Sequence, residues 1–268
     1  MRFWRSRKVT VPVVRLQGTI GMGSPLRPGL SMAGVASAID KAFAMKSPAV
    51  ALVINSPGGS PAQSSLIFTR VRKLAEEKEK RVFVFVEDVA ASGGYWLAVA
   101  GDEIYADATS ILGSIGVVTA TFGFTELLEK LGVERRIYTI GENKAILDPF
   151  KPEREQDIAI LRAVQQDIQD AFVAVVKARR GEKLSSDPDL FTGRFWSGTS
   201  ALGHGLIDGI GDLRTVLRNR YGAKVVLKPI SAARQSFWRK SLGLSADLSA
   251  EAMIGAVRAD RLWERHGL

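Results

Sequence analysis

The sequence predicts an α/β fold in which helices flank a parallel sheet. Two short, continuous apolar runs, at residues 49–54 and 81–86, have the composition of strands that are buried on both faces of a sheet. The segment between them, 60–77, carries its apolar residues at helical spacing. Strand, helix and strand in this order form a βαβ unit, which requires parallel strands and a right-handed crossover.

The remaining elements follow from the same kinds of local pattern. Before the βαβ unit we expect a strand at 8–20, a glycine-rich turn at 21–29 and a helix at 31–45. After it we expect a strand at 103–106, a glycine-rich segment at 112–118, a helix at 125–131, a strand at 135–140, a long amphipathic helix from 152 to about 180, a short helix at 200–203, a strand stub at 206–208, a helix at 212–221 and a closing strand at 223–230.

Length and composition indicate one main domain, over residues 1–230, followed by an extension at 231–268. The extension is richer in Ser, Ala and Arg and has a weakly amphipathic helix around 248–263. The chain has no cysteine, which excludes disulfides, thiolate metal sites and cysteine nucleophiles. It has only two histidines, which excludes metal sites built from several of them.

The net charge of +9 would suit an anionic partner. Its one dense cluster mixes cations with aromatic side chains: Arg2, Phe3, Trp4, Arg5, Arg7 and Lys8. Such a segment is either a solvated chain end or a point of peripheral membrane contact, and we expect no nucleic-acid binding. No apolar run approaches the ~20 residues of a transmembrane helix, and no signal peptide is evident. These features predict a cytoplasmic or peripherally membrane-associated protein.

The segment Asn55-Ser56-Pro57-Gly58-Gly59 follows the first buried strand, at the end of the sheet where open α/β folds bind ligands. A Pro-Gly-Gly turn can be no more than a tight connection to the next helix. Glycine also lets the backbone approach a substrate closely. In that functional interpretation the N–H of Gly59, helped by Gly58, stabilises an oxyanion.

The segment Ala90-Ala91-Ser92-Gly93-Gly94-Tyr95 lies where the second buried strand gives way to a helix. Ser92 can act as the helix N-cap. Because small residues flank it, its hydroxyl is also accessible as a nucleophile, and the N–H of Gly93 can be a second oxyanion donor. The two interpretations are compatible. We expect Gly58 and Gly94 to contribute to substrate binding.

A serine nucleophile needs a base, and neither His204 nor His266 lies in a catalytic motif. Lys144, in Gly141-Glu142-Asn143-Lys144-Ala145, is a candidate, although most lysines are solvated surface charges. A lysine base must be neutral, which requires burial to lower its pKa from ~10.4 toward ~7–8. Ser114, in Leu112-Gly113-Ser114-Ile115-Gly116, can hold such an amine in place. The alternative is that its neighbouring glycines only shape a turn.

Taken together, these motifs resemble the signal peptide peptidase A (SppA) family of serine peptidases, relatives of the Clp protease and the crotonases. The similarity runs from about Val9 to about Leu213 and includes the later segments Gly193-Arg194-Phe195-Trp196-Ser197-Gly198 and Gly205-Leu206-Ile207-Asp208. The separation of 52 residues between Ser92 and Lys144 is similar to that in short members of the family. The segment 148–152, Asp-Pro-Phe-Lys-Pro, departs from the more usual Ser-Pro-Phe-Arg pattern.

The resemblance implies a Clp/crotonase-like fold with repeated ββα units, and a peptidase domain at 1–230 with its core at about 9–213. It implies that Ser92 is the nucleophile, Lys144 the general base and Ser114 the hydroxyl that orients the lysine. It further implies that Gly59 and Gly93 are the oxyanion donors and that no cofactor is needed. The implied substrates are extended or unfolded peptides, such as signal-peptide remnants or membrane-associated proteins. The implied assembly is a homo-oligomer with active sites near subunit interfaces.

Two other functions remain open at this point. A crotonase-type acyl-CoA enzyme would use the same paired backbone donors for a thioester enolate, but it would not require Ser92 and Lys144 together. A non-catalytic scaffold would use the basic N-terminus and the extension to bind a membrane or partner proteins. The presence of Ser92, Ser114 and Lys144 in one chain favours the peptidase.

Overall fold

The computed structural model describes residues 8–21 and 29–231. Contacts divide the chain into two compact units. Of the described residues, the first unit holds 8–21, 29–116 and 172–231, and the second holds 117–171. The helix expected around 248–263 and most of the basic N-terminal cluster lie outside the described residues.

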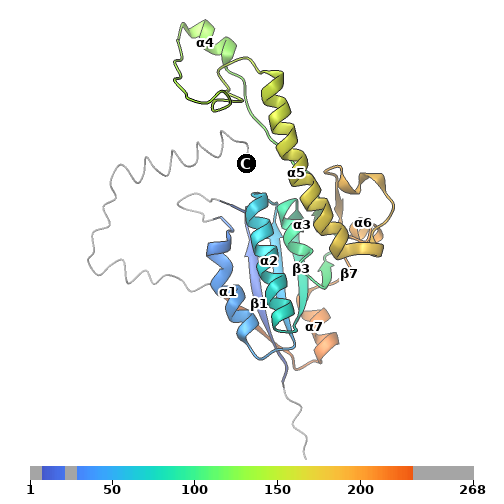
Figure 1. Ribbon diagram of the computed structural model, residues 1–268. Coiled ribbons are helices and arrows are strands. Elements are labelled where there is room, and N and C mark those ends of the chain that lie inside the picture. The colour runs from blue at the N-terminus through green and yellow to red at the C-terminus, as the bar shows by residue number, and fades with distance from the viewer. Residues whose placement is uncertain (1–7, 22–28, 232–268) are drawn as a thin grey trace, which may run out of the picture. The chain divides into compact units, whose positions relative to one another are not determined.

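A sheet of eight strands forms the centre of the first unit (Figure 1). Its strands are β1 (Thr10–Gln17), β2 (Ala49–Ser56), β3 (Arg81–Ala91), β4 (Glu103–Ala106), β5 (Ile111–Gly113), β6 (Phe195–Ser197), β7 (Gly209–Ile210) and β8 (Val226–Ile230). The main order is β6-β5-β3-β2-β1-β8, and β4 pairs with both β3 and β7. The β5–β6 pair is antiparallel, whereas the other pairs are parallel. The carboxyl ends of β1, β2 and β3 therefore meet at one edge.

Helices cover both faces of this sheet (Figure 1). The first unit contains α1 (Met32–Ala44), α2 (Pro61–Glu77), α3 (Gly93–Ala98), α6 (Gly198–Gly203), α7 (Leu213–Tyr221) and the 3₁₀ helices η1 (Gly181–Lys183) and η2 (Pro188–Phe191). Helices α1, α2 and α3 share the larger hydrophobic core with one face of the sheet. Helix α7 packs through Leu217 against the other face. The central strands are buried from both sides, as their continuous apolar runs predict.

Polar residues begin three of these helices. The side chains of Ser31, Ser60 and Asp212 accept hydrogen bonds from the first-turn amides of α1, α2 and α7. Small polar residues are favoured at this position because they bind amides that have no partner within the helix. The predicted starts of these helices at 31, 60 and 212 are confirmed to within one residue.

The second unit contains α4 (Thr125–Leu131) and, from the long helix α5 (Glu155–Arg180), residues 155–171. Between 117 and 154 every hydrophobic residue is partly or fully exposed. Aromatic and ionic contacts connect this region internally, because the Phe124 ring lies 5.4 Å from that of Phe150, and Arg135 both stacks on Phe150 and pairs with Asp148. The second unit is thus held together by few contacts and lacks a buried core between 117 and 154.

The predicted α/β fold with a parallel sheet and flanking helices is confirmed. Two predicted strands are wrong. Residues 135–140 form no strand, and Tyr138 and Ile140 are 90% and 100% exposed, because the second unit offers no neighbouring strand with which their backbone can pair. The stub expected at 206–208 is instead the two-residue strand β7, which begins at Gly209 beside Tyr105.

Candidate active site

Ser92 lies in a strained turn between β3 and α3. Its backbone has φ 50° and ψ −124°, a conformation that is costly for a residue with a Cβ. It occupies the N-cap position of α3, but its side chain makes no capping hydrogen bond. The Ser92 hydroxyl therefore does not cap α3, which was one of the two interpretations of this residue. A strained strand-to-helix turn is also how α/β-hydrolases expose a nucleophilic serine.

The Gly58–Gly59 turn packs directly against Ser92. A Cβ built on Gly58 would lie 2.8 Å from the Ser92 Cβ and 2.9 Å from the Gly93 amide nitrogen. A Cβ built on Gly59 would overlap the carbonyl of Ile20 on the opposite side. Both glycines have positive φ, at 107° and 138°. Only residues without a side chain fit this turn, which brings its backbone within contact distance of Ser92.

The backbone amides of two glycines lie near each other beside the Ser92 turn. Gly59 pairs with Ile20 in an isolated parallel bridge. The hydrogen bonds of this bridge involve the neighbours of Gly59, because the Ile20 amide donates to the Gly58 carbonyl and the Ser60 amide donates to the Ile20 carbonyl. The Gly59 N–H consequently points away from Ile20. A Cβ built on Gly93 would lie 3.4 Å from the Gly59 nitrogen, so the two glycines adjoin. The Gly93 amide is the first of α3 and has no acceptor within that helix.

Close backbone packing also fixes the glycines next to the Ser92 turn. A Cβ on Gly94 would overlap the carbonyl oxygen of Ser56, and one on Gly93 would overlap the hydroxyl of Ser64. Ser64 is fully buried and donates a 2.9 Å hydrogen bond to the Ser60 carbonyl. The start of α3 is thus pressed against the start of α2 and the end of β2.

Ser114 and Ser92 each follow the last residue of one of two paired strands. Strands β3 and β5 pair Ala91 with Gly113, and the Ser92 amide donates a 2.8 Å hydrogen bond to the Gly113 carbonyl. Ser92 follows Ala91 and Ser114 follows Gly113, and both serines have positive φ, at 50° and 52°. The structure therefore brings Gly58, Gly59, Ser92, Gly93, Gly94 and Ser114 together in the first unit.

Lys144 belongs to the second unit. It lies in a turn, where its amide donates a 3.2 Å hydrogen bond to the Gly141 carbonyl, and its side chain is exposed. The turn is followed by Asp148, which pairs with Arg135 and whose side chain is only 4% exposed. The expectation that Lys144 follows a strand is wrong. Its pairing with Ser92 is taken up below as a proposal.

A second group of residues combines a serine, a histidine and an aspartate. The Ser185 hydroxyl lies 3.1 Å from Nδ1 of His204, and an Asp187 carboxylate oxygen lies 3.6 Å from the same nitrogen. A catalytic triad needs the serine on one ring nitrogen and the carboxylate on the other. The His204 ring also packs against the Trp196 ring in a tilted arrangement, with centroids 5.0 Å apart. This geometry indicates a structural histidine, as the sequence led us to expect.

Buried and half-buried contacts hold helix α3 along its length and just beyond its C-terminal end. The Tyr95 hydroxyl donates a 2.8 Å hydrogen bond to the Leu206 carbonyl, and burial raises the pKa of Tyr95. The Trp96 ring stacks on Phe172 of α5 at 4.7 Å. Arg179 donates to the carbonyls of Val99 and Gly101, just beyond the helix. Ser92 thus precedes a helix that is buried and held by contacts with α5 and with the Leu206 backbone.

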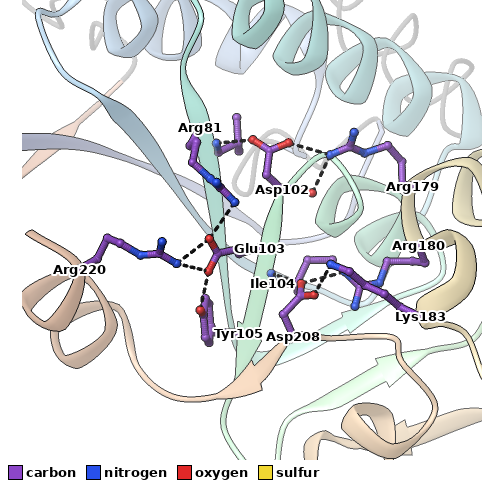
Figure 2. Close-up of polar contacts among 12 residues, drawn as sticks. Arg81, Asp102, Glu103, Ile104, Tyr105, Arg179, Arg180, Lys183, Asp208 and Arg220 are labelled. Carbon is purple, nitrogen blue, oxygen red and sulfur yellow. Dashed lines mark hydrogen bonds and ion pairs between the residues drawn. The ribbon is translucent and has the colours of Figure 1, made fainter.

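An ionic network around β4 is the main feature that the sequence analysis did not predict (Figure 2). Asp102 accepts hydrogen bonds from the Val82 amide and from Arg179 and Arg72. Burial alone would raise the pKa of Asp102, but these hydrogen bonds and the two guanidinium charges outweigh it and hold the pKa below its ordinary value of 3.8. The sequence signal was weak, because the partners are up to 77 residues apart.

Asp208 is the second centre of this network (Figure 2). It binds Arg180, whose side chain is only 2% exposed, as well as Lys183 and the Ile104 amide. Burial alone would raise the pKa of Asp208, but these partners outweigh it and lower the pKa. Glu103 similarly binds Arg81, Arg220 and Tyr105. These contacts tie α5, β4 and β7 together, and their role is structural.

Within residues 8–21 and 29–231, no group of three or more His, Cys, Asp or Glu side chains is arranged to hold a metal ion. Over the same residues, no helix has both the length and the hydrophobicity that a membrane span requires.

Comparison with known families gives one clear match. The model of peptidase family S49 matches residues 74–226, which is more than half of the chain. Ser92, Ser114 and Lys144 lie within this range, whereas Gly58 and Gly59 precede it.

Individual relatives differ in name and in length. The chain is 54% identical over its whole length to a Brucella abortus protein named Na(+)/H(+) antiporter NhaA, of which it covers 38%. It is 35% identical over 60% of its length to the chloroplastic serine protease SPPA of Arabidopsis thaliana, of which it covers 24%. It is 32% identical over 75% of its length to protease 4 of Haemophilus influenzae, of which it covers 32%. The chain thus spans well under half of each of these relatives.

Proposed function

Because the chain belongs to peptidase family S49, we propose that it is a serine endopeptidase with Ser92 as nucleophile and Lys144 as general base. The observation that carries this proposal is the Ser92 turn. Its hydroxyl has no capping partner, its backbone is strained, and the amides of Gly59 and Gly93 adjoin it. A nucleophile next to two preorganised amide donors is the arrangement that acyl transfer requires.

In the proposed reaction, neutral Lys144 accepts the proton of the Ser92 hydroxyl as the Ser92 oxygen attacks the carbonyl carbon of the peptide bond. The carbonyl π-electron pair moves to oxygen, and the amides of Gly59 and Gly93 stabilise the resulting oxyanion. The tetrahedral intermediate then collapses, the C–N bond breaks, and the lysine ammonium gives its proton to the leaving amine. Water, deprotonated by the same lysine, releases the acyl group and restores Ser92.

The base requires an environment that the exposed turn around Lys144 does not itself supply. A lysine acts as a base near neutral pH only where burial or a neighbouring positive charge favours its neutral form. We propose that assembly with further copies of the chain buries the Lys144 turn, and that Ser114 then orients the amine. The exposed hydrophobic side chains of the same unit, Val118, Phe122, Leu127, Leu131, Tyr138 and Ile140, support an assembled state.

The proposed substrates are extended or unfolded peptides, including signal-peptide remnants and segments of membrane-associated proteins. A site formed by backbone donors at the carboxyl ends of strands suits a substrate that binds as an extended chain. Gly58 and Gly94 would contribute by leaving room for its backbone. Family membership disfavours the acyl-CoA alternative.

Peptide cleavage tests the assignment. We would compare the wild-type protein with Ser92→Ala, Lys144→Ala and the control Lys151→Ala on an unstructured fluorogenic peptide. Lys151 is an exposed lysine of the same unit. Removing either member of a catalytic pair should lower the rate by at least about a thousandfold, whereas Lys151→Ala should cleave like wild type. Undiminished cleavage by folded Lys144→Ala would reject Lys144 as the base.

Mixing the two inactive variants tests the assembly. If the active site combines residues of two subunits, subunit exchange between Ser92→Ala and Lys144→Ala will restore part of the activity. If activity stays absent although native mass spectrometry detects mixed oligomers, each subunit must supply its own Ser92 and Lys144.

A further inference from the structure

One peptide group lies between the proposed nucleophile and the segment that leads into β6. Its carbonyl, that of Gly113, accepts a 2.8 Å hydrogen bond from the Ser92 amide. Its N–H, that of Ser114, donates a 2.7 Å hydrogen bond to the Arg194 carbonyl. The two atoms belong to one planar unit and point in opposite directions. A rotation of this single peptide group would therefore break both hydrogen bonds and move both serines.

The residues on either side of this peptide group have unusual backbone conformations. The φ angle is 99° at Gly113 and 52° at Ser114. A positive φ is costly for a residue with a Cβ, so the local sequence does not favour this conformation at Ser114. Packing from elsewhere in the fold must maintain it.

The side chain of Trp196 supplies such packing. A Cβ built on Gly113 would lie 2.7 Å from Cε3 and 2.8 Å from Cζ3 of the Trp196 indole. Trp196 lies opposite Leu112 in the antiparallel β5–β6 pair, and it is only 6% exposed. The ring fills the space beside the Gly113 Cα, so the backbone cannot shift in that direction without displacing the indole.

Further contacts hold the indole and the turn that it supports. The His204 ring packs against the Trp196 ring, with centroids 5.0 Å apart. Beyond Ser114, a Cβ built on Gly116 would lie 2.9 Å from the Gly193 Cα, so the two backbones touch. The turn that carries Ser114 is thus held on both sides of the serine.

We propose that Trp196 is a positioning residue, which holds the peptide group that joins Ser92 and Ser114, and this role rests on the proposed function of the two serines. A catalytic group displaced by about 1 Å can cost about a hundredfold in rate. An interaction that positions reacting groups affects the chemical step more than substrate binding. Loosening the contact should therefore lower kcat and leave KM nearly unchanged.

Two substitutions of Trp196 and one control test this role. Trp196→Leu removes the ring, whereas Trp196→Phe keeps a smaller ring on the same strand. The matched control, Phe43→Leu, removes a buried aromatic ring from the same hydrophobic core. Phe43 lies near the end of α1, and its carbonyl accepts a hydrogen bond from Lys80, which directly precedes β3. It is therefore at the amino ends of the strands, away from Ser92. Urea denaturation reports the stability of each variant.

We expect Trp196→Leu to lower kcat for peptide cleavage by about tenfold to a hundredfold, with KM changed by less than about threefold. Trp196→Phe should keep at least about a third of the wild-type kcat, because its ring still packs on Gly113. Phe43→Leu should lose stability but keep the wild-type kcat. A wild-type kcat in folded Trp196→Leu would overturn the proposal and leave the Ser92 and Lys144 assignment standing. An equal fall in Phe43→Leu would also overturn it, because the effect would then follow stability alone.

Amide hydrogen exchange tests the same contact without relying on activity. The amides of Ser92 and Ser114 would be compared with those of β2, which correct for changes in the stability of the whole unit. Relative to β2, both amides should exchange at least about tenfold faster in Trp196→Leu and at the wild-type rate in Phe43→Leu. Unchanged protection of both amides in Trp196→Leu would overturn the proposal. Faster exchange in a chain whose wild type cleaves no peptide would confirm the contact and reject the proposed function.

Discussion

The two halves of the proposed active site differ in how the chain supports them. Around Ser92, Gly93 and Gly94 are buried, and an added Cβ would overlap the Ser64 hydroxyl at Gly93 and the Ser56 carbonyl at Gly94. Around Lys144, every hydrophobic side chain from 117 to 154 is partly or fully exposed. The proposed nucleophile and its proposed amide donors are therefore positioned by the fold of the first unit. The proposed base lies on a segment that has no core of its own.

This difference separates two requirements of the chemistry. Oxyanion donors must be positioned to within a fraction of an ångström, and close packing of glycine backbone against a sheet supplies that accuracy. A lysine base mainly needs removal from water, which a second copy of the chain can supply on assembly.

Replacing a glycine with alanine should give the largest difference in stability between the two units. Gly94→Ala places a Cβ against the Ser56 carbonyl, and we expect it to lower the free energy of unfolding by at least about 3 kcal/mol. The Cβ added by Gly123→Ala in the second unit has no atom within 4 Å, so this variant should change the free energy of unfolding by less than about 0.5 kcal/mol. Urea denaturation of both variants measures the contrast. Similar values for the two would mean that the Ser92 region is not tightly packed.

Ser64 and Gly93 allow a sharper test of the same packing. Gly93→Ala should destabilise the protein by roughly 1–3 kcal/mol, because its Cβ overlaps the buried Ser64 hydroxyl. Ser64→Ala removes that oxygen, so the double variant should recover about 1 kcal/mol relative to the sum of the single effects. A double-mutant cycle by urea denaturation measures this coupling. Strict additivity would show that the two residues do not touch.

Tyrosine hydroxyls give a smaller contrast. Tyr95→Phe leaves the buried Leu206 carbonyl without its hydrogen-bond donor and should cost about 1–2 kcal/mol of stability. Tyr138 in the second unit is 90% exposed, and Tyr138→Phe should leave stability unchanged. Thermal unfolding monitored by circular dichroism compares the two. An unchanged midpoint for Tyr95→Phe would contradict the support that we assign to α3 through the Tyr95 hydroxyl.

Acid should destabilise the first unit through Asp102 and Asp208. The folded-state pKa of each lies below the ordinary value of 3.8, so each contributes stability above that pH and loses it as the pH falls toward the folded value. The free energy of unfolding should therefore decline below about pH 4, and less steeply in Asp102→Asn. Urea titrations from neutral pH to about pH 3 follow the decline. Identical pH profiles for the variant and wild type would remove Asp102 from this account.

Exposed hydrophobic residues of the second unit should affect assembly and leave the stability of the chain unchanged. Ile140 is 100% exposed, so Ile140→Ser should change the free energy of unfolding by less than about 0.5 kcal/mol. It should nevertheless reduce the oligomeric fraction in analytical ultracentrifugation and lower peptide cleavage in parallel. An oligomeric state and activity equal to wild type would place the assembly surface elsewhere.

The same contrast explains what could be predicted from the sequence. The run 49–54 and the helix at 60–77 were correctly predicted because local hydrophobic pattern determines elements that lie in a core. The run 135–140 carries an apolar pattern as well, but strand formation depends on a neighbour that its unit does not provide. The local hydrophobic pattern therefore gave a correct prediction for segments that the fold buries, and a wrong one for a segment that stays exposed.

The candidate site divides in the same way. The sequence placed the motifs of Gly58 and Ser92 at the ends of adjacent strands, which predicts that they lie near each other but not that they are in direct contact. The positive φ of Ser92 and Ser114, and the overlap that excludes side chains at Gly93 and Gly94, depend on long-range packing. The Asp102 and Asp208 networks join residues whose separation in sequence hides their pairing.

Covalent labelling tests the central claim most directly, which is that the fold prepares Ser92 as a nucleophile activated by Lys144. Wild type, Ser92→Ala and Lys144→Ala would each be incubated with a peptidyl fluorophosphonate, and the adduct located by peptide mass spectrometry. The account predicts one adduct, on Ser92 of the wild type, no adduct in Ser92→Ala, and labelling slowed by about a thousandfold or more in Lys144→Ala. An adduct on another serine, or undiminished labelling of Lys144→Ala, would contradict it.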